Sequence, residues 1–132
     1  MVVDMYEREV GAVKISFRII CYKGLHEETK AALAAFIAHF HGQILSMGDT
    51  AYWKDEEFRL LEVQAQLEYT DLSLIKGAIC RIFSIPPEDM TEDRDRDSMQ
   101  LSRYSHIEER DKIFFTLYII STEDNIYESS CH

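Results

Sequence analysis

The segment from Phe58 to Tyr69 constrains the fold most, because apolar and polar side chains alternate along it. Its apolar set is Leu61, Val63, Ala65, Leu67 and Tyr69. Its polar set is Glu62, Gln64, Gln66 and Glu68. Because successive side chains of a β-strand point to opposite sides of the sheet, this alternation predicts a strand with one buried face and one wet face.

A second alternating segment runs from Val10 to Tyr22. Its apolar face consists of Val13, Ile15, Phe17, Ile19 and Cys21, and its polar face of Lys14, Ser16 and Arg18. Such strands need a layer that covers their apolar side only. We expect the polar face to lie beside Glu62, Gln64, Gln66 and Glu68, with Phe114, Thr116 and Tyr118 on its other side. An added hairpin or a partner would cover those last residues.

Two segments carry apolar residues at helical spacing and supply that layer. The first runs from about His26 to His41 in an alanine-rich background, and Gly42 is a typical helix stop. The second spans Asp71–Ile85, with Asp71 as its N-terminal cap and Pro86-Pro87 after its end. Both helices are expected on the same face of the sheet.

The remaining strands complete a β-α-β-β-α-β order, which resembles the ferredoxin-like fold. Gln43–Met47 predicts a brief strand that continues irregularly through Tyr52 and Trp53, and the apolar run Lys112–Ser121 predicts a well-buried strand. The resemblance implies an antiparallel α+β sheet in strand order 4-1-3-2. Pro86–Asp111 is too long for an ordinary loop, and the alternation over Met99–Ile107 predicts an added hairpin strand before the last strand. We expect residues 1–132 to form one domain, with 122–132 as a flexible tail.

The charge balance narrows the classes of partner. Twenty-four acidic residues against fourteen basic ones give a formal charge of -10 and a pI near 4.9. This charge repels phosphate backbones and anionic membranes, so neither nucleic acid nor membrane is an expected partner. The first residues carry acids where a secretory signal needs cations, which predicts a cytoplasmic protein.

The three cysteines and the histidines predict neither a disulfide framework nor a metal or cofactor site. Cys21 and Cys80 are expected to be buried, unpaired thiols, and Cys131 falls in the polar tail. The spacing of His39 and His41 places them on different helix faces. No phosphate loop or nucleophile motif is present, so no catalytic residue is assigned.

Acidic side chains concentrate in two segments. The run Glu88–Asp97 reads as a solvated loop or frayed helix, and a second group of acids surrounds Tyr52 and Trp53. Aromatic residues among acids are able to anchor a basic partner. The predicted partner-binding residues are Asp49, Tyr52, Trp53, Asp55, Glu56, Glu57, Glu88, Asp89, Glu92, Asp93, Asp95 and Asp97.

In these features the chain resembles bacterial immunity proteins, including those of contact-dependent growth-inhibition systems. The resemblance implies stoichiometric neutralisation of a basic protein toxin, such as a nuclease, by occlusion of its active site. Two alternatives remain open. One is a ferredoxin-like regulatory domain that binds a small molecule or dimerises. The other is a small enzyme in which His106, Glu108 or Tyr104 transfers protons.

Overall fold

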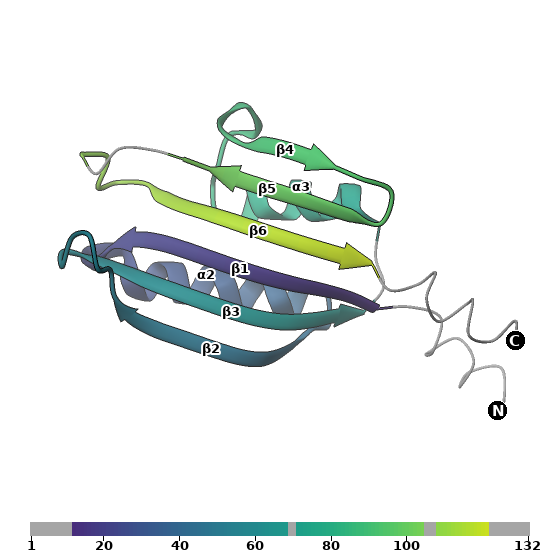
Figure 1. Ribbon diagram of the computed structural model, residues 1–132, viewed down its shortest axis with the longest axis horizontal. Helices are drawn as coiled ribbons and strands as arrows, with labels where there is room; N and C mark the ends of the chain where they lie inside the picture. Colours follow the sequence, from purple (N-terminus) through teal and green to yellow (C-terminus); the bar gives the residue numbers. More distant parts are fainter. Residues whose placement is uncertain (1–11, 69–70, 105–107, 122–132) are drawn as a thin grey trace, which may run out of the picture.

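The computed structural model describes residues 12–68, 71–104 and 108–121, which form an antiparallel sheet backed by two helices (Figure 1). The strands are β1 (Ala12–Tyr22), β2 (Gln43–Ala51), β3 (Phe58–Glu68), β4 (Thr91–Arg94), β5 (Ser98–Arg103) and β6 (Ile113–Ser121). The α-helices are α2 (His26–His39) and α3 (Leu72–Ile82), and two short 3-10 helices are η1 (Lys23–Leu25) and η2 (Pro87–Asp89). The predicted α+β class is confirmed.

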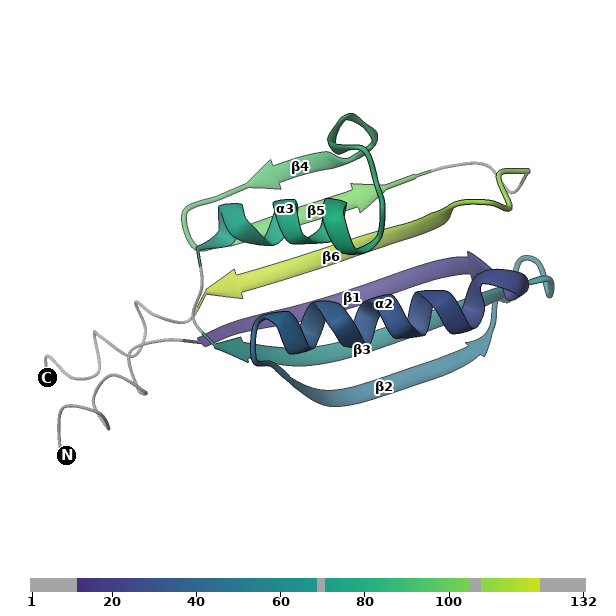
Figure 2. The ribbon, with the colours of Figure 1, turned by 180° about the vertical axis from the view of Figure 1, so that it is seen from behind.

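The six strands follow the order β2-β3-β1-β6-β5-β4. Both helices lie on the same face of this sheet, as Figure 2 shows from behind. The part made of β1, α2, β2, β3, α3 and β6 is compatible with the ferredoxin-like arrangement. The hairpin of β4 and β5 extends the sheet beyond β6.

The core lies between the helices and the sheet, and the alternating faces of β1 and β3 point as predicted. Phe17 of β1 is 2% exposed and contacts the rings of Phe36, Phe83 and Phe115, with centroids 6.1, 5.8 and 5.7 Å away. Phe36 and Phe83 come from the α2 and α3 regions, and Phe115 comes from β6. This ring cluster joins both helices to the centre of the sheet.

Both helices end earlier than predicted, and the end of α2 has a clear physical cause. In α2 the left-handed residue is His41, with a φ of 53°, whereas Gly42 has no positive φ. The amide of Gly42 donates to the carbonyl of Ile37 at 2.9 Å and that of His41 to Ala38 at 3.0 Å, which is a Schellman motif. In α3 the predicted Asp71 cap is confirmed, since its Oδ1 accepts from the Ser73 amide at 3.0 Å.

Two strand predictions need correction. β2 does not stop at Met47 but continues regularly to Ala51, after a register shift between Ile44 and Ser46. The run Glu88–Asp97 is neither a loop nor a frayed helix, because it contains the end of η2 and the strand β4. The predicted extra strand is therefore half of a two-stranded hairpin, which lies in the plane of the sheet and does not cover its open face.

The two described cysteines differ in burial, which corrects one prediction. Cys21 is fully buried, but Cys80 is only half-buried at the edge of the core. Burial raises the pKa of both thiols, so neither is an activated nucleophile. Cys131 and the predicted tail 122–132 lie outside the described residues.

We expect thiol labelling of the native protein to distinguish these cysteines. Cys80 should react slowly and Cys21 should react only on the timescale of unfolding, since a buried thiol must become exposed before it meets the reagent. Mass spectrometry of labelled peptides measures each rate separately. Equal native rates for Cys21 and Cys80 would contradict this core assignment, and labelling in denaturant provides the reference rate.

Candidate functional site

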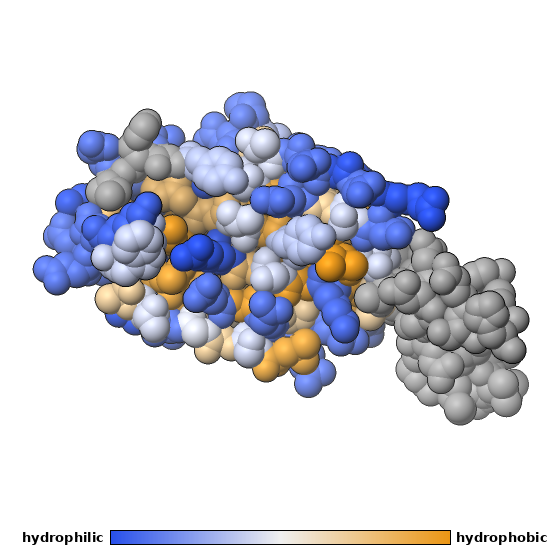
Figure 3. Space-filling model, viewed as in Figure 1, coloured by the Kyte–Doolittle hydropathy of each residue, from blue (hydrophilic) through white to orange (hydrophobic). Residues whose placement is uncertain are grey.

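The face of the sheet opposite the helices is open, and its side chains follow from the strand register. Arg18 of β1 lies between Glu62 of β3 and Thr116 of β6. As predicted, the polar faces of β1 and β3 lie side by side, and Arg18 Nε lies 3.8 Å from Glu62 Oε2. Most side chains of this face are polar, but apolar surface is visible between them (Figure 3).

Part of the apolar surface lines a hollow of about 400 Å³ at one end of the open face. Its lining residues are Arg18, Ile20, Tyr52, Trp53, Lys54, Phe58, Arg103, Tyr104, Phe114, Phe115 and Thr116. Ile20 and Phe114 are cross-strand partners, and Phe114 is 8% exposed although it belongs to the open face. Trp53 and Tyr104, in contrast, are each 73% exposed. The hollow thus combines buried apolar side chains with two accessible aromatic rings.

The connection between β2 and β3, which carries Trp53, is held by several backbone contacts. The Tyr52 amide donates to the Phe58 carbonyl at 2.9 Å, and the Phe58 amide donates to the Asp55 carbonyl at 3.0 Å. Asp55 Oδ1 accepts from the Glu57 amide at 3.0 Å. These bonds fix the turn, so the backbone that carries Trp53 is already ordered before a partner binds, which lowers the entropy cost of binding.

Two side-chain contacts add to this support. Glu57 Oε2 lies 2.6 Å from Arg110 Nη1, whose guanidinium sits 5.3 Å from the centre of the Tyr22 ring. Lys54 Nζ lies 5.0 Å from the centre of the Trp53 ring. The positive charge beside Trp53 is therefore Lys54, and Glu57 is occupied by a contact within the fold.

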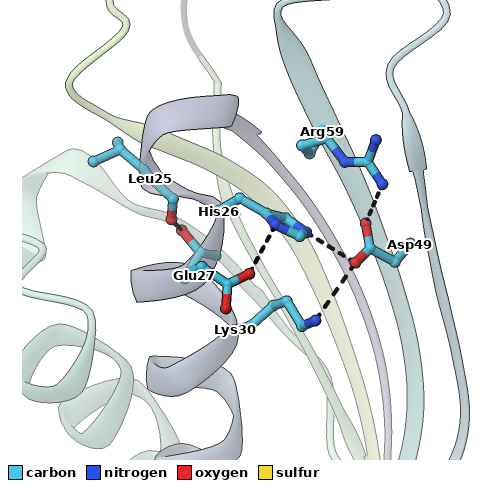
Figure 4. Close-up of polar contacts among 7 residues, drawn as sticks. Leu25, His26, Glu27, Lys30, Asp49 and Arg59 are labelled. Atoms are coloured by element: carbon cyan, nitrogen blue, oxygen red, sulfur yellow. Dashed lines mark hydrogen bonds and ion pairs between the residues drawn. The ribbon is translucent and has the colours of Figure 1, made fainter.

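Asp49 occupies the helix side of the sheet and joins three elements (Figure 4). Its Oδ1 accepts from Arg59 Nη2 of β3 at 2.7 Å, and its Oδ2 lies 2.8 Å from His26 Nε2 and 3.7 Å from Lys30 Nζ of α2. Partial burial acts to raise the pKa of Asp49, but the hydrogen bonds from Arg59 and His26 outweigh it and hold the pKa below its ordinary value. Asp49 therefore stabilises the fold and is not available to a partner.

Replacing Asp49 with Asn should lower the free energy of unfolding by about 1 kcal/mol at neutral pH, because Arg59 and Lys30 lose their anionic partner. A carboxyl with a lowered folded-state pKa stabilises the protein above its unfolded-state pKa and loses this effect as pH falls through the folded-state value. The difference between wild type and D49N in urea unfolding should consequently shrink in acid. A difference independent of pH would contradict the proposed role of the charge.

The second acidic segment is also partly neutralised from within. Asp89 Oδ2 lies 2.8 Å from Arg103 Nη2, and Glu92 Oε1 lies 3.1 Å from Lys76 Nζ. Asp95 Oδ1 accepts from the Arg96 amide at 2.9 Å, and the Asp97 carbonyl accepts from the Ser121 amide at 2.8 Å. These contacts hold η2, β4 and the following turn in place.

Among the predicted acids, Glu56, Glu88 and Asp93 are exposed and make no such contact with the part of the chain that the structure describes. Glu56 lies in the β2–β3 connection, whereas Glu88 and Asp93 lie in η2 and β4. β2 and β4 are opposite edges of the sheet. The structure therefore does not bring the two acidic segments together on one surface.

A second cavity, of about 490 Å³, lies on the helix side between the start of α2 and the end of α3. Its basic side chains already have partners, since Arg103 contacts Asp89 and Lys112 Nζ donates to Glu109 Oε1 at 3.0 Å. The open-face hollow, with its exposed rings, is the better candidate for binding.

Of the candidate proton-transfer residues, Tyr104 lines the hollow and Glu108 is exposed, while His106 lies outside the described residues.

His39 Nε2 lies 3.4 Å from Arg81 Nη2 at the surface. Within residues 12–68, 71–104 and 108–121, no group of three His, Cys, Asp or Glu side chains is arranged to hold a metal ion. No helix of these segments has the length and apolar character needed to cross a membrane.

Sequence reasoning located Tyr52 and Trp53 but missed the hollow beside them. The sequence did offer a signal, which is a change from polar to apolar residues on the open faces of β1 and β3. The polar face of β1 ends on apolar Ile20, and that of β3 begins with apolar Phe58 and Leu60. Apolar residues on both faces of neighbouring strands indicate a second, smaller apolar cluster on the open side.

No known protein family matches the sequence, and no curated protein matches it either. Among solved structures, the chain is similar to the C-terminal domain of the MgtC protein from Mycobacterium tuberculosis, whose solution structure is known. The two are 8% identical and superpose with a TM-score of 0.47, over 56% of this chain and 77% of that domain.

Proposed function

We propose that this protein is a ferredoxin-like domain with an added hairpin that acts by stoichiometric binding, as an immunity-type inhibitor of a basic protein toxin. The observation that carries the proposal is Trp53, which is 73% exposed on a turn fixed by backbone hydrogen bonds. Large aromatic side chains of this kind dominate the binding energy of protein interfaces. The contact surface is the β2–β3 connection together with the open-face hollow.

The shape of the hollow supports a protein partner. Trp53 and Tyr104 stand exposed on its rim, while Ile20 and Phe114 form its apolar floor. An apolar side chain of the partner that enters the hollow would contact this floor and bury the ring of Trp53. Such a central apolar contact surrounded by polar residues is the usual arrangement of a binding interface.

The charge of the chain supports a basic partner. The chain carries a formal charge of -10, and Glu56, in the same turn as Trp53, is exposed. Long-range attraction between this charge and a cationic protein speeds their encounter, and salt screens it. A nuclease with a cationic substrate cleft is such a partner, and its occlusion is the proposed inhibitory mechanism.

The test is a kinetic measurement with the protein encoded by the neighbouring upstream gene. If that protein is the basic toxin, the association rate constant should fall about tenfold or more between low and high salt, while the dissociation rate changes little. Glu56→Lys should slow association. Asp93→Lys, a matched reversal in β4, should slow it less, because β4 and the β2–β3 connection lie at opposite edges of the sheet.

Two outcomes would contradict the proposal. One is association that does not depend on salt. The other is an interface that leaves Trp53 as exposed in the complex as in the free protein. Inhibition of the toxin at a one-to-one ratio, measured as loss of its activity on its own substrate, would complete the demonstration.

A second candidate function is small-molecule binding in the same hollow. Its volume of about 400 Å³ falls within the range of ligand pockets, roughly 300–1,000 Å³. Arg18 and Lys54 would favour an apolar ligand with a carboxylate. A rise in melting temperature with such ligands, together with no binding to a basic protein, would favour this candidate.

A further inference from the structure

The two edges of the sheet differ in a way that the proposed function does not use. β4, at one edge, has the sequence Thr-Glu-Asp-Arg, and all four residues are exposed. Charged side chains on a short edge strand discourage other chains from pairing with it. β2, at the other edge, is nine residues long and carries no charged side chain and no proline from Gln43 to Gly48.

β2 also exposes large apolar side chains. Ile44, Leu45 and Met47 are 42%, 55% and 41% exposed. The register shift between Ile44 and Ser46 leaves Leu45 without a partner residue on β3. Three such residues within four positions form an apolar patch, and patches of this kind mark interaction sites on soluble proteins.

The flank of α2 continues this apolar surface. Lys30 reaches Asp49 of β2, which shows which side of the helix faces that strand. Ala34 and Ala38 follow Lys30 at four-residue spacing, so they lie on the same side, and both are exposed. Small side chains on this flank allow another molecule to approach the helix closely. Figure 2 shows α2 running along the sheet with β2 beyond it at the edge.

The charges around this surface select its occupant. A strongly acidic chain attracts basic partners, but the segment from Gln43 to Gly48 offers such a partner no acidic side chain. The next residue, Asp49, is neutralised by Arg59, His26 and Lys30. Two acidic copies of this chain, in contrast, are able to meet here without bringing unpaired carboxylates together. An antiparallel contact about a two-fold axis also places apolar residues of one β2 against those of the other.

The available length suits a stable dimer. Nine residues of strand extend over about 30 Å. Two copies of β2 that pair in antiparallel orientation would bring backbone groups and apolar side chains together along this length. We propose that the edge of β2 and the adjacent flank of α2 form the interface between two copies of this chain.

The test is the mass of the full chain in solution, measured by sedimentation equilibrium over a wide range of concentration. The wild-type protein should dimerise. Leu45→Lys places a charge in the apolar patch and should raise the dimer dissociation constant about tenfold or more, because the charge would have to be desolvated. Thr91→Lys is the matched control, since it adds the same charge to the β4 edge, and it should leave the dimer unchanged.

A second measurement needs no variant. Hydrogen exchange of the wild-type protein should show backbone amides of β2 becoming more protected as concentration rises, while those of β4 do not change. A chain that stays monomeric at the highest concentration would overturn the proposal. So would a dimer that L45K leaves intact, or one that T91K weakens equally. Binding of the basic partner through Trp53 should be the same for L45K and wild type, so the two proposals fail independently.

Discussion

Replacing Trp53 with alanine is expected to weaken binding of the basic partner by about 2 kcal/mol or more, which is roughly thirtyfold in the dissociation constant. The effect should lie mainly in the dissociation rate, because Trp53 acts after the two proteins have met. The folding of the domain should not change, since the ring is 73% exposed and lies outside the main core. Surface plasmon resonance measures both rate constants.

Two variants make this test specific. Trp53→Phe keeps an aromatic ring in the same position and should retain part of the affinity. Leu74→Ala removes an apolar side chain that is 61% exposed on α3, on the opposite face of the sheet, and should leave binding unchanged. Equal weakening by W53A and L74A would indicate that exposed apolar area, and not the β2–β3 connection, determines affinity.

The central strands were predictable because each has one buried face. Along β1 and β3 the period of two in the sequence matches the period of two in burial, from Val13 to Cys21 and from Leu61 to Leu67. The same reasoning failed for β4, which is exposed on both faces. An edge strand with no buried face leaves no alternation in its sequence, so Thr91–Arg94 was read as part of a charged loop.

The role of Asp49 was not predictable for a different reason. Its position beside Tyr52 and Trp53 suggested an acid that faces a partner. The three groups that contact it are His26 and Lys30 in α2 and Arg59 in β3, and no local pattern connects them with Asp49. Their meeting depends on the packing of α2 against the end of the β2–β3 pair. Asp89 and Glu92 illustrate the same point, because their partners Arg103 and Lys76 are also distant in the sequence.

Gly42 correctly indicated where α2 ends, but glycine is needed there for a different physical reason. Gly42 was expected to end the helix, and glycine commonly does so in the left-handed conformation, but here that conformation belongs to His41, with a φ of 53°. What requires glycine at position 42 is space. A Cβ built there would overlap with Leu67 Cδ2 and would lie 2.9 Å from Ile37 Cγ2 and 3.1 Å from the Gln66 carbonyl oxygen.

Gly42→Ala is therefore expected to lower the free energy of unfolding by about 2–3 kcal/mol, since overpacking a close contact forces the neighbouring side chains and backbone to move. His41→Gly should instead raise the free energy of unfolding by about 0.5–1 kcal/mol, because glycine adopts the left-handed conformation without steric cost. Urea unfolding of the two variants measures both changes. If Gly42 served as the left-handed residue, H41G would bring no gain, whereas the observed geometry requires these adjacent positions to respond with opposite signs.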